Sequence, residues 1–266
     1  MIGGTVPGEV TFEASRAGTG YLSEIYSAIQ GEGVLTGVRQ IFVRLAGCNI
    51  RCDYCDQPES LVRTERCRIE KTAGRRDFEE RSNPLAVHDV FAAIARLHGE
   101  GTLHRWVSFT GGEPLLQADF LAELLPRVRE AGLKPFLETS GILPDALANV
   151  SHLLDFVSMD WKLPSSSATP PLWARHESFL RGIGHAGGQV KIVVCAGTDP
   201  FELERAARTI ADVRPGMPLI LQPVTPFGTS QQPPAPAQLL DFQVLGLRYL
   251  ADVRVIPQTH KMIGQL

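Results

Sequence analysis

The sequence predicts an α/β fold with a mainly parallel sheet of about six strands, arranged as a modified, partial (β/α) barrel. Short apolar, β-branched runs alternate with stretches of helical period, which is typical of a parallel sheet. Polar and glycine-rich residues directly follow several of these runs. In barrels of this kind the carboxyl ends of the strands hold the chemistry. Because the strand count is nearer six than eight, an incomplete barrel fits better than a closed one.

The expected strands are apolar runs of about five residues, and in order they cover 40–45, 106–110, 135–139, 156–160, 190–194, 218–222 and 253–256. The expected helices lie between these runs. The segment 87–97 has apolar residues at helical spacing, and Phe120 to Ala131 repeats the pattern before Gly132 ends it. Further helices are expected at 201–213 and 237–247.

The chain is expected to form a single domain. Residues 1–20 form a polar tail, and 21–266 form the domain. Near 59–83 the sequence is rich in Arg and Glu and shows no clear strand, so we expect an irregular insertion, a solvated loop or short helix in preference to a substrate lid. A proline-rich connector covers 231–236.

The composition excludes several classes of function. The 266 residues have 26 basic and 29 acidic side chains, for a net charge of -3, which argues against nucleic-acid binding driven by bulk charge. No stretch approaches the roughly 20 apolar residues that span a bilayer. The first 20 residues lack the apolar core of a signal peptide. We therefore expect a cytoplasmic protein without a membrane or nucleic-acid partner.

Three of the five cysteines, Cys48, Cys52 and Cys55, lie within eight residues. Their C-x3-C-x2-C spacing supplies three thiolates, so an iron–sulfur cube held by them would keep one iron open for chemistry, unlike a fully ligated electron-transfer cluster. A structural zinc site would need a fourth ligand, and a redox Cys-x-x-Cys pair would not need Cys48. Cys195 ends an apolar run and is expected in a buried strand, whereas Cys67 is expected to be a free loop thiol.

Two motifs together resemble the radical S-adenosylmethionine (SAM) enzymes. The cysteine run follows one expected strand, and Gly111-Gly112-Glu113-Pro114 follows another. The resemblance implies a 4Fe-4S cluster whose open iron chelates SAM, and reductive cleavage of SAM to a 5′-deoxyadenosyl radical. It places Tyr54 near the adenine and Gly112 and Glu113 near the SAM amino group, since glycine allows close approach and a carboxylate pairs with an ammonium.

Longer motifs resemble the 7-carboxy-7-deazaguanine synthase family in particular, and the likeness runs from about Tyr21 to the end of the chain. They cover Ile29 to Gly33, Phe42 to Asn49, Glu138 to Gly141, Asp160 to Ser166, Leu221 to Pro223 and Gln258 to Lys261. The resemblance implies ring contraction of 6-carboxy-5,6,7,8-tetrahydropterin to 7-carboxy-7-deazaguanine with loss of ammonia, a step towards queuosine and other 7-deazapurines. It also implies a homodimer and, as electron donor, an unidentified flavodoxin- or ferredoxin-like protein.

The expected binding residues fall into two sets. For SAM they are Tyr54, Cys55, Asp56, Gly112, Glu113, Ser158, Met159, Asp160, Gln222, Pro223, Val224 and Thr225. For the pterin they are Ile29, Gln30, Gly31, Glu32, Arg44, Thr110, His260 and the C-terminal Leu266. Among these, Arg44 offers a forked cation for the pterin carboxylate, and Gln30 and Glu32 could bind the amide edge of the ring. Lys162 is either a salt-bridge lysine or a cation of the SAM pocket.

One position departs from the family pattern. Where the family usually has a small hydroxyl residue that helps to bind Mg²⁺, this chain has Gln57. An amide oxygen can ligate Mg²⁺, but glutamine is longer, so the need for magnesium is an open question.

Two alternative functions are also considered. A glycyl-radical activating enzyme shares the three-cysteine loop and acts on a protein partner, and a non-catalytic zinc-binding module would use the thiols for folding alone.

Overall fold

The structure is a computed structural model that describes residues 18–101, 103–226 and 231–265. Its main feature is a ten-stranded sheet in the order β12-β11-β10-β9-β8-β7-β3-β2-β4-β5. Within the described residues, the first seven of these strands run parallel to one another. In chain order they are β3 (Arg39–Leu45), β7 (Trp106–Gly111), β8 (Lys134–Thr139), β9 (Phe156–Asp160), β10 (Gly187–Val194), β11 (Leu219–Pro223) and β12 (Val253–Val255).

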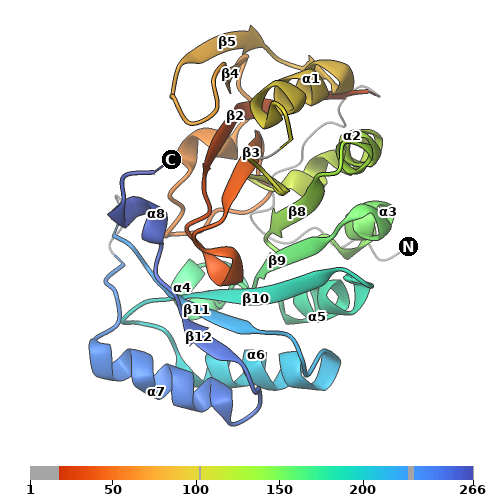
Figure 1. Ribbon diagram of the computed structural model, residues 1–266. Coiled ribbons are helices and arrows are strands. Elements are labelled where there is room, and N and C mark those ends of the chain that lie inside the picture. The colour runs from red at the N-terminus through yellow and green to blue at the C-terminus, as the bar shows by residue number, and fades with distance from the viewer. Residues whose placement is uncertain (1–17, 102, 227–230, 266) are drawn as a thin grey trace.

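All seven expected strands and four expected helices are present. The sequence predicted about six parallel strands, close to the seven in the described residues. The helices line the outer side of the curved sheet (Figure 1). They are α1 (Val87–His98), α2 (Ala118–Glu130), α3 (Pro144–Val150), α5 (Trp173–Gly182), α6 (Pro200–Val213) and α7 (Pro236–Leu247). A large apolar core lies between helices and sheet, so the inner side of the sheet is free to hold polar residues.

The sheet is a partial barrel. In the described part of the chain, β5 and β12 are its edge strands and do not pair with each other. Short elements complete the fold: strands β1 (Thr19–Gly20) and β6 (Leu85–Ala86) pair antiparallel, and the remaining helices are single turns. These turns are η1 (Gly33–Leu35), η2 (Pro58–Leu61), η3 (Pro114–Gln117), η4 (Ser151–Leu153), α4 (Pro164–Ser167) and α8 (Thr259–Met262). None of the helices in the described residues is both long and apolar enough to cross a membrane.

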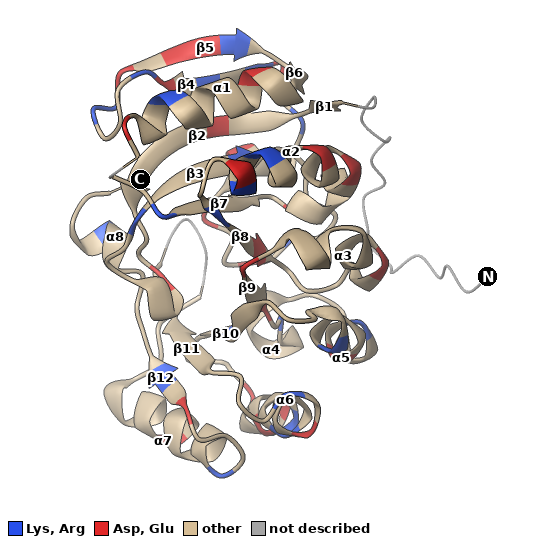
Figure 2. Ribbon diagram, turned by 45° about the vertical axis from the view of Figure 1, so that its right-hand side comes forward, with Lys and Arg blue, Asp and Glu red and all other residues tan. Residues whose placement is uncertain are grey.

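The expectation of a loop or short helix near 59–83 was wrong. Apart from η2, this segment contains the antiparallel strands β4 (Arg66–Glu70) and β5 (Phe78–Ser82), which extend the sheet beyond β2 (Leu22–Ile29). Cys67 and Ile69 point into the core between exposed arginines, so the segment does have strand alternation. Charged residues cover this edge (Figure 2) and include an Arg66–Glu80 ion pair across the two strands. The number of arginines and glutamates concealed the strand period.

The two remaining cysteines are both buried. Cys195 is fully enclosed, as expected, but lies one residue after the end of β10 and not within the strand. Cys67 is not the loop thiol that was expected, because it points from β4 into the main apolar core and is also fully enclosed. Burial raises the pKa of the Cys67 thiol to about 12. Cys67 is therefore an unreactive core residue.

Candidate active site

A polar pocket lies at the carboxyl ends of strands β3, β7, β8, β9, β10 and β11. This is the edge where a sheet of this type holds its functional groups. The pocket brings together most of the predicted residues. These are Ile29, Gln30, Gly31, Glu32, Arg44, Cys48, Cys52, Tyr54, Cys55, Asp56, Gln57, Thr110, Gly112, Asp160, Gln222, Val224, Thr225 and His260.

Four predicted residues do not line this pocket. Ser158 and Met159 are buried in β9, where Ser158 accepts a hydrogen bond from Gln189 at 2.9 Å and Met159 points into the apolar core. Glu113 is fully buried, and Pro223 ends β11. Leu266, the predicted C-terminal substrate contact, lies outside the described residues, as does most of the 1–20 tail.

The loop with the three cysteines is fixed at its base. Gly47 N–H donates to the Ser60 carbonyl at 2.8 Å, and Cys48 N–H donates to the Leu61 carbonyl at 3.2 Å. All three thiols line the pocket, and Cys48 and Cys52 also contact an apolar cluster. Burial raises the pKa of Cys48 to about 12 and also raises that of Cys52. A metal cluster binds thiolates, so loading would release protons from these thiols.

The three cysteines line one pocket, as the ligands of a polynuclear cluster would. Among the described residues, no three Cys, His, Asp or Glu side chains converge on one metal ion. Each cysteine of a cubane binds a different iron, so such convergence is not required. Two polar atoms of pocket residues, Tyr54 Oη and Gln222 Oε1, are buried without a hydrogen-bond partner in the described residues. They leave hydrogen-bonding capacity for a polar ligand beside the thiols.

Gly111 and Gly112 are needed mainly for packing against the cysteine loop. Gly111 has a φ of +128°, and an added Cβ would lie 2.0 Å from the Leu45 carbonyl oxygen. At Gly112 it would lie 2.2 Å from the Gly47 carbonyl oxygen. Glu113 N–H donates to that same carbonyl at 2.8 Å. The Gly-Gly-Glu segment therefore supports the loop, and its two glycines line the pocket.

The Glu113 carboxylate lies behind the pocket wall. It accepts hydrogen bonds from the Thr139 hydroxyl at 2.8 Å, from Ser140 N–H at 2.8 Å and from Leu115 N–H at 3.0 Å. Burial raises its pKa, although these donors oppose the shift. Thr139 and Ser140, which sequence analysis did not select, line the pocket in front of it. Glu113 thus fixes the Glu-Thr-Ser-Gly segment after β8, and a direct contact of Glu113 with SAM stays a prediction.

Arg44 lies at the carboxyl end of β3 with its guanidinium in the pocket wall. Its Nε donates to Glu24 at 2.9 Å, and a terminal nitrogen donates to the Tyr26 hydroxyl at 2.7 Å. Burial alone would lower the pKa of Arg44, but the facing Tyr26 and Glu24 outweigh it and raise the pKa. Arg44 is therefore a fixed cation, not the surface arginine that such a strand could have carried.

Glu138 is a central pocket residue whose role the sequence did not indicate. Its carboxylate accepts from Gln30 and from Ser108, both at 2.8 Å, and Thr110 approaches it at 3.4 Å. Burial and the charge of Glu32 raise its pKa. Its only signal was its place in the Glu138–Gly141 motif. Glu138, which was not predicted, thus contacts two predicted substrate residues, Gln30 and Thr110.

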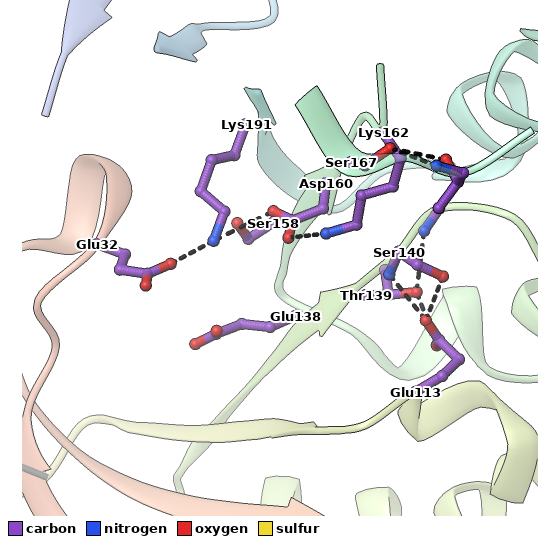
Figure 3. A network of polar contacts seen from close by, with 12 residues as sticks. Glu32, Glu113, Glu138, Thr139, Ser140, Ser158, Asp160, Lys162, Ser167 and Lys191 are labelled. Atoms are coloured by element: carbon purple, nitrogen blue, oxygen red, sulfur yellow. Dashed lines mark hydrogen bonds and ion pairs between the residues drawn. The ribbon is translucent and has the colours of Figure 1, made fainter. Parts of the chain in front are cut away.

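Lys191 is a further pocket residue that sequence analysis missed. Its ammonium forms a short ion pair with Glu32 and lies 3.2 Å from Asp160, its direct neighbour across the sheet. Lys162 binds the other oxygen of Asp160 at 2.7 Å and lies over the Tyr54 ring. Figure 3 shows this succession from Glu32 through Lys191 and Asp160 to Lys162. In the sequence, the one indication of Lys191 was the presence of a single lysine within the apolar run 190–194.

The C-terminal segment completes the wall opposite these strands. Gln258 Nε2 donates both to Glu32, at 2.8 Å, and to Asp56, at 2.9 Å. Lys261 pairs with Asp56 at 2.7 Å. An added Cβ on Gly31 would lie 2.2 Å from His260 Nδ1, so glycine allows this segment to pack closely. Gln258 and His260 are therefore part of the pocket.

Comparisons with known proteins identify the family to which this fold belongs. The model of the radical SAM superfamily matches residues 43–178, which include the cysteine loop and β3 to β9. The chain thus belongs to the radical SAM superfamily. A 7-carboxy-7-deazaguanine synthase of Geobacter sulfurreducens is 45% identical over 92% of this chain and 97% of the relative. Within the superfamily the chain is a member of the 7-carboxy-7-deazaguanine synthase family, as the resemblance indicated.

Other relatives support this placement. A 7-carboxy-7-deazaguanine synthase of Thermococcus kodakarensis is 35% identical over 92% of this chain and 98% of the relative. Among solved structures, QueE from Escherichia coli covers 90% of this chain and 94% of its own with a TM-score of 0.59 and 22% identity. A structure of TYW1 with a lysine-pyruvate adduct has a TM-score of 0.53, 14% identity, and coverage of 79% and 74%. At such identities the two structures confirm the fold alone.

Proposed function

We propose that this enzyme is a radical SAM lyase that converts 6-carboxy-5,6,7,8-tetrahydropterin to 7-carboxy-7-deazaguanine with loss of ammonia. The observation that carries the proposal is one pocket with three cysteines on one wall and Arg44, Gln30 and Glu138 on another. A cation beside amide and carboxylate groups suits a ligand that has both a carboxylate and a pterin amide edge. Membership of the synthase family supports the same substrate.

The residues present would hold the two cofactors side by side. Cys48, Cys52 and Cys55 would ligate the 4Fe-4S cluster, and the open iron together with SAM supplies the radical that takes a hydrogen atom from the substrate. Tyr54, Asp160, Gln222, Val224 and Thr225, which line the pocket, would surround SAM. Its amino group would lie along Gly112, with Glu113 holding that wall from behind. This division of the pocket is the one that the family resemblance implies.

On the substrate side the chain's own groups orient the pterin. Arg44 would bind its carboxylate, and the Gln30–Glu138 pair with Glu32 would hold the amide edge. Thr110 and His260 complete the wall, and the C-terminal Leu266 is proposed to follow them. Because strand ends and fixed loops hold these side chains, the ring would be positioned before the hydrogen atom is removed. Burial lowers the pKa of His260, which favours its neutral form.

Magnesium, assembly and electron supply also belong to this proposal. Gln57 lines the pocket directly after Asp56, so its amide oxygen could replace the family's hydroxyl as a ligand of Mg²⁺. We propose a homodimer, as the family resemblance implies, and a flavodoxin- or ferredoxin-like reductant in the cytoplasm, where reduced thiols are kept. A Gln57→Leu variant, which removes the amide oxygen, assayed with and without Mg²⁺ tests the ligand. We expect magnesium to stimulate the wild type more than the variant, and equal stimulation would contradict the role of Gln57.

The test of the reaction is anaerobic incubation of the reconstituted protein with SAM, a reductant and 6-carboxytetrahydropterin. We expect 7-carboxy-7-deazaguanine, identified by mass and ultraviolet absorbance, and about one ammonia per product. If no deazaguanine forms with or without Mg²⁺, the specific assignment is wrong. A glycyl-radical activating enzyme would instead release 5′-deoxyadenosine only when its protein partner was added.

Metal analysis separates the enzyme from a zinc-binding module. We expect a brown protein with about four irons per chain, the stoichiometry of a cubane cluster. A colourless protein with one tightly bound zinc would contradict the radical mechanism. Since Arg44 and Lys191 are buried and Glu138 is half-buried around the pocket, the structure also has more polar groups than a zinc-stabilised fold requires.

A further inference from the structure

A chain of polar contacts passes around the pocket and begins and ends at the cysteine loop. It starts at Tyr54, passes through Lys162, Asp160, Lys191 and Glu32, and reaches Asp56 through Gln258. The strands of the partial barrel do not close on each other in the described residues. These side-chain contacts therefore connect parts of the pocket that the backbone of the sheet leaves apart.

Lys191 has a particular place in this chain of contacts. Its ammonium lies between Glu32, which belongs to the loop assigned to the substrate, and Asp160, which belongs to the strand assigned to SAM (Figure 3). It is 7% exposed, so water does little to weaken either ion pair. Burial alone would lower its pKa, but the charges of Asp160 and Glu32 outweigh this and raise it. Lys191 is thus a permanent cation.

The two partners of Lys191 do not depend on it equally. Asp160 has a second cation, Lys162, at 2.7 Å from its other oxygen. Glu32 has no second cation among the described residues, because its remaining side-chain partner is the neutral amide of Gln258. Loss of the Lys191 charge would therefore release Glu32 while Asp160 stays paired. The substrate side of the pocket would loosen and the SAM side would hold.

We propose that Lys191 is a positioning residue that fixes the substrate loop, through Glu32, relative to the SAM-binding end of β9. The proposal rests on the function proposed above and adds a residue that connects its two halves. Its contribution is alignment: the hydrogen atom to be removed must lie close to the radical, and a displacement of about 1 Å can cost about 10²-fold in rate. Lys191 would thereby also keep the radical from reacting without forming product.

The test compares Lys191→Met, which keeps the length of the side chain and removes its charge, with the wild type. We expect product formation to fall about 10²-fold, the dissociation constant of SAM to change less than about 3-fold, and 5′-deoxyadenosine released per product to rise. A general loss of structure would lower product and deoxyadenosine together. Lys134→Met is the matched control. This lysine begins β8 at the opposite end of the sheet, over the Trp106 ring, and its loss should leave all three quantities unchanged.

A double-mutant cycle shows whether Lys191 acts through Glu32. Lys191→Met should add less than about 3-fold to the effect of Glu32→Gln, because the interaction is already lost. If Lys191→Met does not fold with full iron content, Lys191→Gln keeps a donor without the charge and is expected to show the same pattern. The inference is overturned if the effects of Lys191→Met and Glu32→Gln on product formation multiply. It is also overturned if Lys191→Met weakens SAM binding as much as turnover, or leaves the deoxyadenosine released per product unchanged. No product from the wild type would overturn the proposed function, and this inference with it.

Discussion

Two clusters of buried and half-buried polar side chains lie at the same sheet and have different consequences. Around the pocket, Glu32, Lys191 and Asp160 contact one another and also line the pocket. Near the amino end of β7, His104 contacts the Ser27 hydroxyl at 2.7 Å, and Arg39 donates to the same hydroxyl at 3.0 Å. These last three residues do not line that pocket. A buried Ser–His pair is therefore not by itself a catalytic site.

The difference between the clusters is one of position. The His104 cluster packs against Glu70, which accepts the Ser27 N–H at 2.9 Å and the N–H of Arg76 at 2.7 Å in the β4–β5 turn. These hydrogen bonds of Glu70 hold the β4–β5 hairpin against the rest of the sheet. The pocket cluster lies at the carboxyl ends of the strands, where loops diverge and leave room for a ligand. We therefore expect changes in the first cluster to alter stability and changes in the second to alter activity.

The largest effect is expected from the cysteines. Cys52→Ala should abolish both cluster and product, because one iron would lose its thiolate. Cys67→Ala should keep both, since Cys67 lies in the apolar core on the hairpin side of the sheet, and should lower the free energy of unfolding by about 1 kcal/mol. Iron content, the visible spectrum and product formation check both variants. Loss of the cluster in the Cys67 variant would contradict the three-ligand assignment.

Arg44 and Arg68 provide a matched pair at one carboxylate. Both pair with Glu24, but the Arg44 side chain is 11% exposed in the pocket wall and that of Arg68 is 55% exposed on β4. Arg44→Met should lower kcat/KM for the pterin about 10- to 100-fold, because a charge-assisted hydrogen bond contributes about 1.5–3 kcal/mol. Arg68→Met should change it less than about 3-fold. Steady-state kinetics check this, and similar losses in both variants would mean that Glu24, rather than the substrate, requires Arg44.

The His104 cluster should make stability depend on pH. Burial, together with the nearby Arg39 and His98, lowers the pKa of His104 to about 4 from its usual 6.5. The unfolded chain therefore takes up a proton at a pH where the folded chain does not, so stability should fall as the pH decreases from about 6.5 to about 4. The contribution is up to about 3 kcal/mol. Urea unfolding of the wild type and of His104→Gln at pH 7 and pH 4.5 measures it. If the free energy of unfolding fell equally in the wild type and in His104→Gln between pH 7 and pH 4.5, His104 would not be the cause.

The smallest effect is expected at the C-terminal segment. The Lys261–Asp56 pair is half-buried, with side chains 27% and 25% exposed. Such a pair contributes about 0–1 kcal/mol, so Lys261→Met should raise the KM of the pterin no more than about 5-fold. Lys71→Met, an exposed lysine in the β4–β5 turn, is the control. A loss above about 20-fold would show that the ending contributes much more to the pocket than the ion pair does.

The sequence indicated the seven parallel strands and the cysteine loop because both have local signals. A buried parallel strand is a short apolar run, and three thiolates at close spacing belong to one loop. The hairpin in 59–83 was not predicted because charged side chains fill its exposed face. Only Cys67 and Ile69 show the alternation of a strand. Ordered motifs also selected Gln30, Glu32, Arg44 and His260, all of which line the pocket.

By itself the sequence determined the class of fold, the family and most residues around the pocket. Only the tertiary structure decided how these residues are joined. Lys191 occupies a run that looks apolar, and its two carboxylates come from positions 32 and 160, far from it in the chain. Glu113 matched a motif yet supports Ser140 from behind the wall. Ion pairs and hydrogen bonds depend on distance in space, which strand register and loop packing set and residue order does not.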